Sequence, residues 1–276
     1  MFSVRFWGVR GSVPVPGPTT VRYGGNTPCV EVRAGSELIV FDAGSGLRVL
    51  GNQLMGAKAV TARMFFSHFH WDHIQGFPFF APAFVHGTRL DLFGAKKLSA
   101  TLSETLAGQM SYPNFPVTLS DLAAQIEFHD LHEGQSVCCG DAVVTNTRLN
   151  HPGGVFAYRV DYGGHAVVFA TDTEHYATLD QKICALAEGA DVLVYDAMYT
   201  PEEYAGSGEL PARTGWGHST WEEGVRVARA ARVRQLVLFH HDPDHDDAAV
   251  DAIEAKAKAS FPATIAAREG LQIDIA

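Results

Sequence analysis

The chain has 276 residues, of which 46% are hydrophobic, and a formal net charge of -10. This length suits a layered α/β enzyme, and we expect residues 1–276 to form a single domain around one core. The acidic balance argues against a protein that binds nucleic acid through a general basic surface, because phosphate backbones are attracted by concentrated positive charge.

Short strand-like segments dominate the first part of the chain. They are rich in Val, Ile and Phe, are bounded by Gly-rich turns, and cover residues 4–7, 29–33, 37–41 and 63–66. A helix is predicted over 96–110, where Leu and Met recur every four residues, and the Pro-containing segment 111–117 ends it.

The second part repeats this scheme. Strands are predicted at 142–147, 156–160, 165–170, 191–195 and 235–239, with helices at 179–188 and 220–232 between them. Two sheets packed face to face with helices outside would bury both sets, although a single mixed sheet is also compatible with the pattern.

The termini and cysteines indicate a cytoplasmic protein. The first residues lack the features of a secretory signal, and the most apolar stretch, 76–85, is far shorter than the roughly 20 residues needed to span a bilayer. The four cysteines show no C-x-x-C spacing and therefore suggest reduced thiols rather than a zinc ribbon or a dithiol redox site: Cys29, Cys138, Cys139 and Cys184.

The segment from His68 to His73 carries the strongest chemical signal. It reads His-Phe-His-Trp-Asp-His and follows an apolar strand. On an extended backbone His68 and His70 project to the same side, and the following turn can bring Asp72 and His73 to the other side of a shared cavity. Imidazole and carboxylate are ligands that suit Zn, Mn or Fe(II), so the segment predicts two metal sites.

This motif, preceded by the segment from Phe41 and Asp42 to Gly46, resembles the metallo-β-lactamase superfamily over essentially the whole chain. The resemblance implies an α/β fold, a four-layer αββα sandwich, with two divalent metal ions of which zinc is the first expectation. It also supplies three further ligands, each near the end of a predicted strand: His151, Asp172 and His240.

The resemblance divides the ligands between two metals. His68, His70 and His151 would hold one ion, Asp72, His73 and His240 the other, and Asp172 would bridge them. His241 is adjacent to His240, so the last ligand could be either residue. The remaining histidines, among them His175, are expected at the surface or behind the ligands, and His245 in a solvated acidic loop that opens the last helix.

The segment around His218 resembles the His-Ser-Thr motif of the phosphodiesterase branch, which includes tRNA 3′-processing ribonucleases and cyclic-nucleotide phosphodiesterases. Ser219 and Glu222 have the spacing of a capping box, which predicts that a helix begins there. His218 would protonate the leaving oxygen or stabilise the charged transition state, with Asp196 orienting it. The catalytic candidates are therefore Asp72, His218 and Asp196.

The glycine-rich segments 8–14 and 23–28 resemble loops of the same branch, in which the backbone can approach the metal rim. Asp42 is expected to brace the histidine loop from a buried position rather than to bind metal. Arg10 or Arg22 could contact a substrate phosphate.

The expected substrate is a small phosphodiester, a cyclic nucleotide first, attacked by a metal-bridging hydroxide. Asp172 stands where the best-known zinc β-lactamases carry cysteine, which disfavours antibiotic hydrolysis. No extended nucleic acid or membrane partner is expected, and a homodimer is possible by resemblance. Tyr112 and Phe115 could stack on a base or pack in a dimer interface. The alternatives are a thioester or other ester hydrolase and an RNA 3′-processing nuclease.

Overall fold

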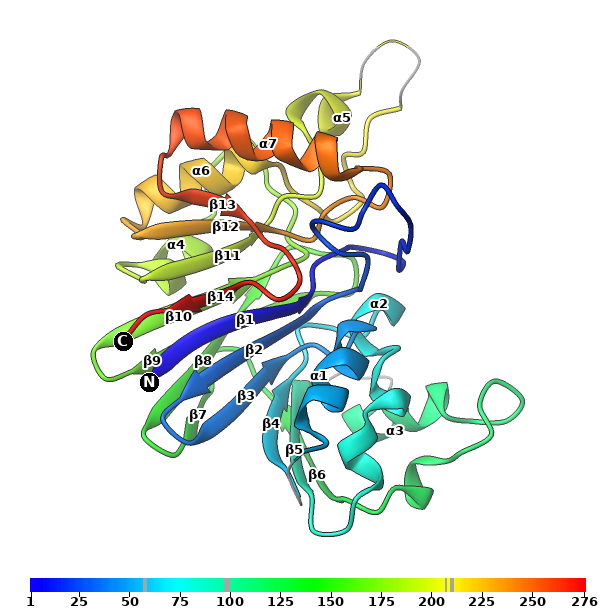
Figure 1. Ribbon diagram of the computed structural model, residues 1–276. Helices are drawn as coiled ribbons and strands as arrows, with labels where there is room; N and C mark the ends of the chain where they lie inside the picture. Colours follow the sequence, from blue (N-terminus) through cyan, green and yellow to red (C-terminus); the bar gives the residue numbers. More distant parts are fainter. Residues whose placement is uncertain (57–58, 97–99, 207, 209–210) are drawn as a thin grey trace.

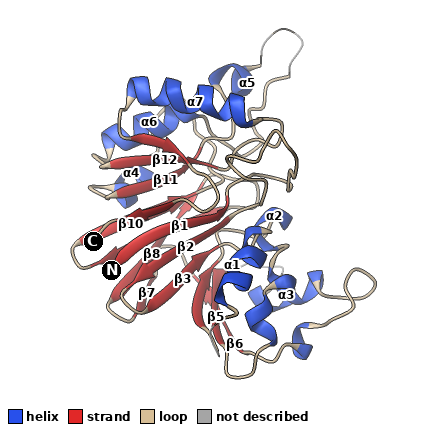
Figure 2. Cartoon of the chain, in the orientation of Figure 1, coloured by secondary structure: helices blue, strands red, loops and turns tan. Residues whose placement is uncertain are grey.

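The structure is a computed structural model that describes residues 1–56, 59–96, 100–206, 208 and 211–276. Within these residues, two seven-stranded sheets form the two inner layers, and helices cover their outer faces (Figures 1 and 2). The predicted four-layer αββα sandwich is thus confirmed, and the alternative of one mixed sheet is excluded.

The first sheet has the strand order β14-β1-β2-β3-β4-β5-β6. Its strands are β14 (Gln272–Asp274), β1 (Phe2–Gly8), β2 (Cys29–Ala34), β3 (Glu37–Phe41), β4 (Thr61–Phe65), β5 (Arg89–Ala95) and β6 (Gln125–Leu131). The second sheet has the order β13-β12-β11-β10-β9-β8-β7. Its strands are β13 (Thr264–Ala266), β12 (Gln235–Phe239), β11 (Val192–Asp196), β10 (His165–Ala170), β9 (Val155–Tyr162), β8 (Ala142–Leu149) and β7 (Ser136–Cys139).

The helices divide between the two outer faces. Over the first sheet lie α1 (Gly46–Leu54), α2 (Trp71–Ile74) and α3 (Leu102–Gln109), with the 3₁₀ turns η1 (Phe77–Phe79), η2 (Ala81–Phe84) and η3 (Leu119–Asp121). On the side of the second sheet lie α4 (Gln181–Ala187), α5 (Pro201–Ala205), α6 (Trp221–Ala230) and α7 (Asp247–Ser260). No described helix is both long enough and apolar enough to cross a membrane.

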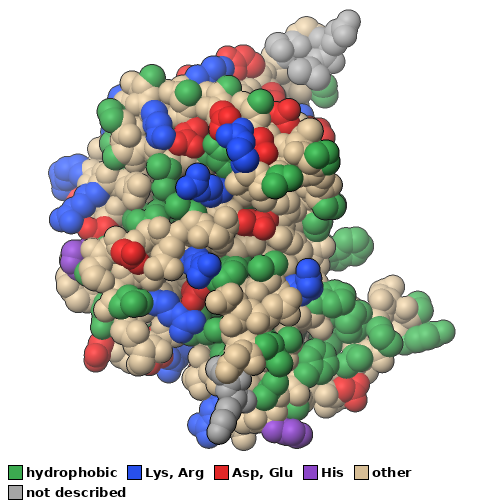
Figure 3. Space-filling model, viewed as in Figure 1, with side chains coloured by type: hydrophobic (Ala, Val, Ile, Leu, Met, Phe, Trp, Pro, Cys, Tyr) green, Lys and Arg blue, Asp and Glu red, His purple; other side chains and the backbone are tan. Residues whose placement is uncertain are grey.

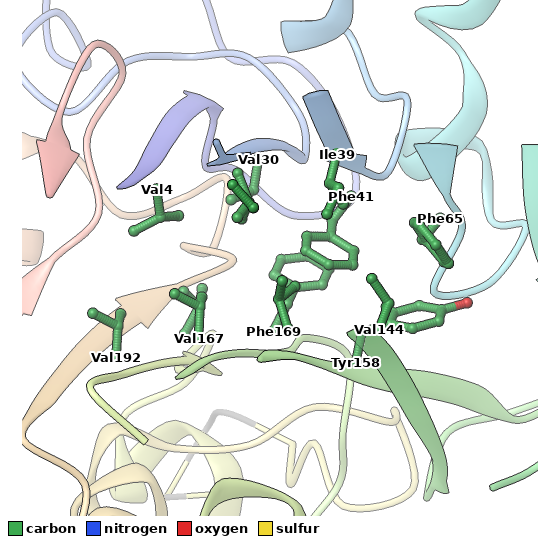
Figure 4. Packing of buried hydrophobic residues seen from close by; sticks show 14 of the residues in the cluster. Val4, Val30, Ile39, Phe41, Phe65, Val144, Tyr158, Val167, Phe169 and Val192 are labelled. Atoms are coloured by element: carbon green, nitrogen blue, oxygen red, sulfur yellow. The ribbon is translucent and has the colours of Figure 1, made fainter. Parts of the chain in front are cut away.

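The main hydrophobic core lies between the sheets. Phe41 of the first sheet stacks on Phe169 and Tyr158 of the second, with ring centroids 5.2 and 5.4 Å apart (Figure 4). A second hydrophobic cluster lies between the second sheet and its helices, and a third lies between the first sheet and its helices. Because both faces of central strands such as β3, β11 and β12 are covered, these strands are almost continuously apolar rather than alternating.

Strand direction brings many strand ends to one edge of the sandwich. β3, β4, β5 and β6 run parallel, so their C-terminal ends lie together. In the second sheet β10, β11 and β12 run parallel, whereas β9 is antiparallel to β10 and β8 to β9. The N–H of Phe156 donates to the Ser67 carbonyl, which joins the two sheets at this edge. Residues that follow these strands can therefore meet (Figure 1).

Several predicted elements need correction. The predicted helix 96–110 is shorter: Thr101 caps α3 through a capping box with Glu104, and residues 97–99 lie outside the described part. β5, β6, β7, β13 and β14 were not predicted. The last two have three residues each, too few to display a strand period.

Candidate metal centre

Three imidazoles meet where β4 and β8 end. The ligand nitrogens of His68, His70 and His151 all lie within 4.8 Å of one another, and Nε2 of His151 is 3.1 Å from Nδ1 of His70. Nε2 of His68 is buried without a hydrogen-bond partner among the described residues. A buried polar atom of this kind normally has a partner, so its orphaned state at the centre of the group suits a metal ligand.

A second group lies beside the first. Asp72, His73, Asp172 and His240 also have ligand atoms within 4.8 Å of one another, and all four are buried. Nε2 of His240 is 3.3 Å from both Oδ2 of Asp72 and Oδ1 of Asp172. These residues come from three separate stretches of chain, so the fold rather than a local loop assembles the group.

Asp172 faces both groups. Its Oδ2 is 3.7 Å from Nε2 of His68 and 4.0 Å from Nε2 of His151, while its Oδ1 is 3.3 Å from Nε2 of His73. One oxygen thus points to each group, which is the arrangement that a bridging carboxylate requires.

The charges of the cluster suit cations. Burial lowers the pKa of His73, but Asp172, Asp72 and Asp42 outweigh it and hold this pKa well above its ordinary value. Burial raises the pKa of Asp172, but the surrounding histidines hold it well below its usual range. The buried carboxylates therefore attract positive charge to the cluster. Imidazole and carboxylate donors suit two divalent ions.

Hydrogen bonds behind the ligands fix their rings. Nδ1 of His73 donates to Oδ2 of Asp42 at 2.7 Å, and Asp42 also accepts from the backbone and side chain of Ser67. Nδ1 of His151 donates to the Gly217 carbonyl at 2.7 Å. Such bonds leave Nε2 of each ring free for a metal. Asp42 thus lies where a brace for the histidine loop was expected.

The choice between His240 and His241 follows from where the rings lie. Nε2 of His240 lies in the second group, whereas Nε2 of His241 bonds to the Ala267 carbonyl at 2.8 Å. Burial lowers the pKa of His241 to about 3, so this ring is neutral. His240 is therefore the ligand candidate.

Three residues of the centre have left-handed backbone conformations. Asp42 and His240 directly follow β3 and β12, Asp172 lies two residues after the end of β10, and their φ angles are 59° for Asp42, 61° for His240 and 51° for Asp172. This region is uncommon for residues other than glycine and is more accessible to Asp and His than to bulkier side chains. The chain turns sharply at these points and directs each side chain to the centre.

His218 and Asp196 form a buried pair next to the cluster. Nδ1 of His218 lies 2.9 Å from Oδ2 of Asp196 and 3.9 Å from Oδ2 of Asp172. The ring of His218 also stacks on His240, with centroids 4.9 Å apart. Asp196 is fixed in turn by the backbone N–H groups of Thr173 and Met198. The predicted pairing of His218 with Asp196 is therefore present in the geometry.

Replacing Asp196 with asparagine should move the alkaline limb of the pH–rate profile to lower pH. Burial lowers the pKa of His218, but Asp196 outweighs it and raises the pKa to about 9 in the metal-free protein. An acid works only while protonated, so a lower pKa loses the acid form earlier as pH rises. Asp191→Asn, beside His165 at the opposite edge, is the matched control. An unchanged alkaline limb would mean that Asp196 does not set this proton.

The helix after His218 begins one residue later than predicted. Thr220, not Ser219, caps α6 by accepting from the N–H of Glu223. Ser219 instead lies inward, with its hydroxyl 2.9 Å from Nδ1 of His175 and 3.1 Å from the Tyr195 hydroxyl. The sequence offers two adjacent hydroxyl residues, each followed by a glutamate three positions later, and buried partners for Ser219 decide between them.

Glu174 is a buried residue of this region that the sequence did not single out. Its carboxylate accepts from the N–H groups of Gly215 and Gly217 at 2.5 and 2.9 Å and from the Tyr204 hydroxyl at 2.9 Å. The backbone N–H of Glu174 donates to the Asn150 carbonyl. Glu174 thus connects the loop that carries His151 to the loop that carries His218. In the sequence, only the position of Glu174 two residues after Asp172 could have suggested that it connects these loops.

Replacing Glu174 with glutamine should weaken metal binding about 10- to 100-fold, the usual effect of disturbing groups behind a ligand. The amide keeps one oxygen but places an NH2 donor where the second of the two backbone N–H groups needs an acceptor, and the displaced Gly217 carbonyl would no longer hold His151. Metal affinity by competition with a chelator measures this effect. Glu31→Gln is the control, since both glutamates are 7% exposed and Glu31 accepts from Trp7, which belongs to the cluster between the first sheet and its helices. Equal metal affinity in both variants would count against the role of Glu174.

Arg10 and His245 lie in buried positions that differ from those expected for them. Arg10 is fully buried and donates to the carbonyls of Gly24, Asp242 and His245, whereas Arg22 pairs with Asp251 at the surface. His245 is buried against Glu203 rather than solvated. The expectations for Arg10 and His245 were wrong because the loops pack on one another, whereas contact between Arg22 and a substrate phosphate stays a prediction.

Phe115 and Tyr112, the two aromatic residues expected to stack on a base or to pack in an interface, differ in their contacts and exposure. Phe115 packs edge-on against Phe79, with ring centroids 5.4 Å apart, and Tyr112 is 91% exposed.

The glycine-rich loop near residue 11 approaches the metal centre, as expected, because the N–H of Ser12 donates to Oδ2 of Asp72 at 2.8 Å. A Cβ added at Gly11 would meet the His240 ring at 2.5 Å.

The family described as "Beta-lactamase superfamily domain" matches residues 38–241, a span that contains all seven ligand candidates. The chain belongs to this superfamily. It is accordingly a metal-dependent hydrolase, as predicted, and the predicted phosphodiesterase branch agrees with the relatives described next.

Curated relatives and solved structures extend this match over the whole chain. Ribonuclease Z of Gemmatimonas aurantiaca is 26% identical and that of Synechococcus sp. (strain CC9311) 24%, each alignment covering 99% of this chain and 96% or 98% of the relative. Among solved structures, the metallo-β-lactamase fold protein YhfI from Bacillus subtilis has a TM-score of 0.74 at 19% identity and covers 99% of this chain and 98% of its own.

Two further structures share the fold at similar coverage. A diphosphatase from the PhnP family has a TM-score of 0.72 at 17% identity and covers 100% of this chain and 98% of its own. The short form of human tRNase Z has a TM-score of 0.68 at 19% identity, with 99% of each chain covered.

Proposed function

We propose that the protein is a dinuclear metal-dependent phosphodiesterase and that its substrate is the 3′ end of an RNA. The observation that carries the hydrolytic part is the His218–Asp196 pair, 2.9 Å apart and buried beside Asp172. A second acid–base group placed against a two-metal cluster suits the release of an alkoxide leaving group, which needs a proton.

The two ions, when bound, supply an activated water and neutralise charge on the phosphate oxygens. His68, His70 and His151 would hold one ion, Asp72, His73 and His240 the other, and Asp172 would join them. His218 would use Nε2 to give its proton to the leaving oxygen, since its Nδ1 is held by Asp196. The N–H of Ser12 keeps Asp72 turned toward the ligands.

The substrate class revises our first expectation of a cyclic nucleotide. Relatives that align over nearly the entire chain are named ribonuclease Z, and this favours the alternative of an RNA 3′-processing nuclease. It also argues against our expectation that no extended nucleic acid is bound.

A small phosphodiester remains the second candidate because of two observations. The alignment with the Synechococcus relative spans 328 positions, more than the 276 residues of this chain, so the relative contains insertions that this chain lacks. On the face seen in Figure 3, lysine and arginine are interspersed with aspartate and glutamate and form no continuous basic surface.

The deciding experiment offers both classes to protein of known metal content. Bis(p-nitrophenyl) phosphate, 2′,3′- and 3′,5′-cyclic nucleotides and a precursor tRNA with a 3′ trailer would be incubated with chelated enzyme, with Zn or Mn restored. We expect metal-dependent cleavage of the model diester and removal of the trailer. Cleavage of cyclic nucleotides alone would select the second candidate. Inactivity on every diester by protein with two bound metals would transfer the proposal to thioester or other ester hydrolysis.

A further inference from the structure

A groove lies beside the metal centre, on the side of β5, β6 and β8. It encloses about 500 Å³ between Lys96, His132 and Arg148 and the backbone of Gly153 and Gly154. None of the ligand candidates lines it, so it is a separate space from the metal cluster.

The topology places this groove on the same edge as the metals. Lys96 directly follows β5 and His132 follows β6, just as the segment leading to His68 follows the neighbouring parallel strand β4. Adjacent strands are about 4.8 Å apart, so the backbone at Lys96 is about one strand spacing from that segment. Arg148 comes three residues before His151, and Gly153 comes two residues after it.

The charge of the groove is positive although the protein is acidic. Lys96 and Arg148 are exposed, and no described carboxylate lies within ion-pair distance of either side chain. Glu133 also lines the groove, where its hydrogen bond with Lys182 at 2.5 Å and, to a smaller extent, the positive charge of Arg148 lower its pKa. Lys96 and Arg148, neither of them held in an ion pair with a described carboxylate, are suited to phosphate.

The guanidinium of Arg148 is held close to the metal-binding loop. Gly154 has a φ of 79°, and a Cβ added there would lie 2.4 Å from Nη2 of Arg148. The side chain therefore packs on the bare backbone just after His151. A larger residue at 154 would push the guanidinium out of the groove.

We propose that this groove is a subsite for the phosphate of the nucleotide adjoining the scissile bond in a single-stranded RNA, with Arg148 and Lys96 as the binding groups. The subsite rests on the proposed phosphodiesterase function. It gives an otherwise acidic protein a local place to hold a polyanion, and it predicts that a longer substrate gains affinity that a small diester cannot.

The test compares wild type with the double variant Lys96→Gln/Arg148→Gln. For a 3′-labelled oligoribonucleotide we expect KM to rise about 10- to 100-fold, as for one or two lost charge-assisted contacts, with a shallower salt dependence. For bis(p-nitrophenyl) phosphate, which does not reach the groove, kcat and KM should stay within about twofold. Arg89→Gln is the matched control, since Arg89 is exposed at the opposite end of β5.

The outcomes separate the subsite from the proposed function. Unchanged oligoribonucleotide kinetics in the double variant, with both substrates still cleaved, would overturn the subsite and leave the phosphodiesterase intact. If wild type cleaves no diester, the proposed function fails, and fluorescence anisotropy of the same oligoribonucleotide decides the subsite: binding that the double variant loses supports it, and equal or absent binding overturns it.

Discussion

Replacing Asp172 with asparagine should leave a folded protein that no longer retains two metal ions and hydrolyses its substrate about 10³-fold more slowly or worse. The reason is geometric, because the two oxygens of Asp172 face the two ligand groups separately. An amide has the same size but lacks the negative charge that two neighbouring cations share. Metal analysis after gel filtration and kcat measured with metal restored would follow both effects.

Asp161→Asn is a suitable control for this variant. Asp161 lies toward the far end of β9, away from the metal edge, and pairs there with Arg159. It should keep two metals and the full rate. Retention of both metals and normal turnover by the Asp172 variant would refute its bridging role.

Replacing His218 with alanine should spare the metals but lower kcat by roughly 10²- to 10⁴-fold, the range for a lost general acid or base. His218 lies within 3.9 Å of Asp172 and bonds to Asp196 through Nδ1, but each of the two ligand groups has at least three donors without it. The metal content and kcat should therefore respond differently. A substrate with a good leaving group, such as p-nitrophenolate, should be less affected because it departs without a proton.

The control for His218 is another histidine with an aspartate partner. His165 lies 3.2 Å from Asp191 at the opposite edge of the same sheet, so His165→Ala removes a similar pair without touching the cluster. Loss of metal from the His218 variant would make it a ligand, and an equal rate loss in both variants would point to a general effect on folding.

Much of the fold followed from the sequence because the central strands have a clear composition. The strands at 37–41, 165–170 and 235–239 consist mainly of Val, Ile, Leu and Phe and are followed within two residues by an aspartate or a histidine, and β3, β10 and β12 match them. The outer strands were missed for the opposite reason. β6 alternates Ile126 and Phe128 with polar residues and so lacks the continuous apolar run of the central strands, and β7 has only four residues.

The candidate site was predictable where a motif was local and not where it depended on packing. Four of the ligand candidates lie within six residues and form a motif that is recognisable in the sequence: His68, His70, Asp72 and His73. Glu174 does not belong to a local motif, since its partners Gly215 and Gly217 are about forty residues away and only the fold brings them together. Arg10 shows the converse error, because an arginine near a glycine loop resembles a phosphate ligand until its three carbonyl partners are known.

At the three left-handed residues of the metal edge, folding stability and metal binding favour different side chains. A side chain in this conformation costs roughly 1–2 kcal/mol that glycine avoids. At Asp42, Asp172 and His240 the chain keeps a carboxylate or an imidazole, so the unliganded fold holds conformational energy where it turns into the centre. A selection for heat-resistant protein without metal should therefore enrich glycine at positions 172 and 240, with a loss of metal-binding capacity, but not at position 42, where glycine would leave the buried donors of Ser67 and His73 without an acceptor.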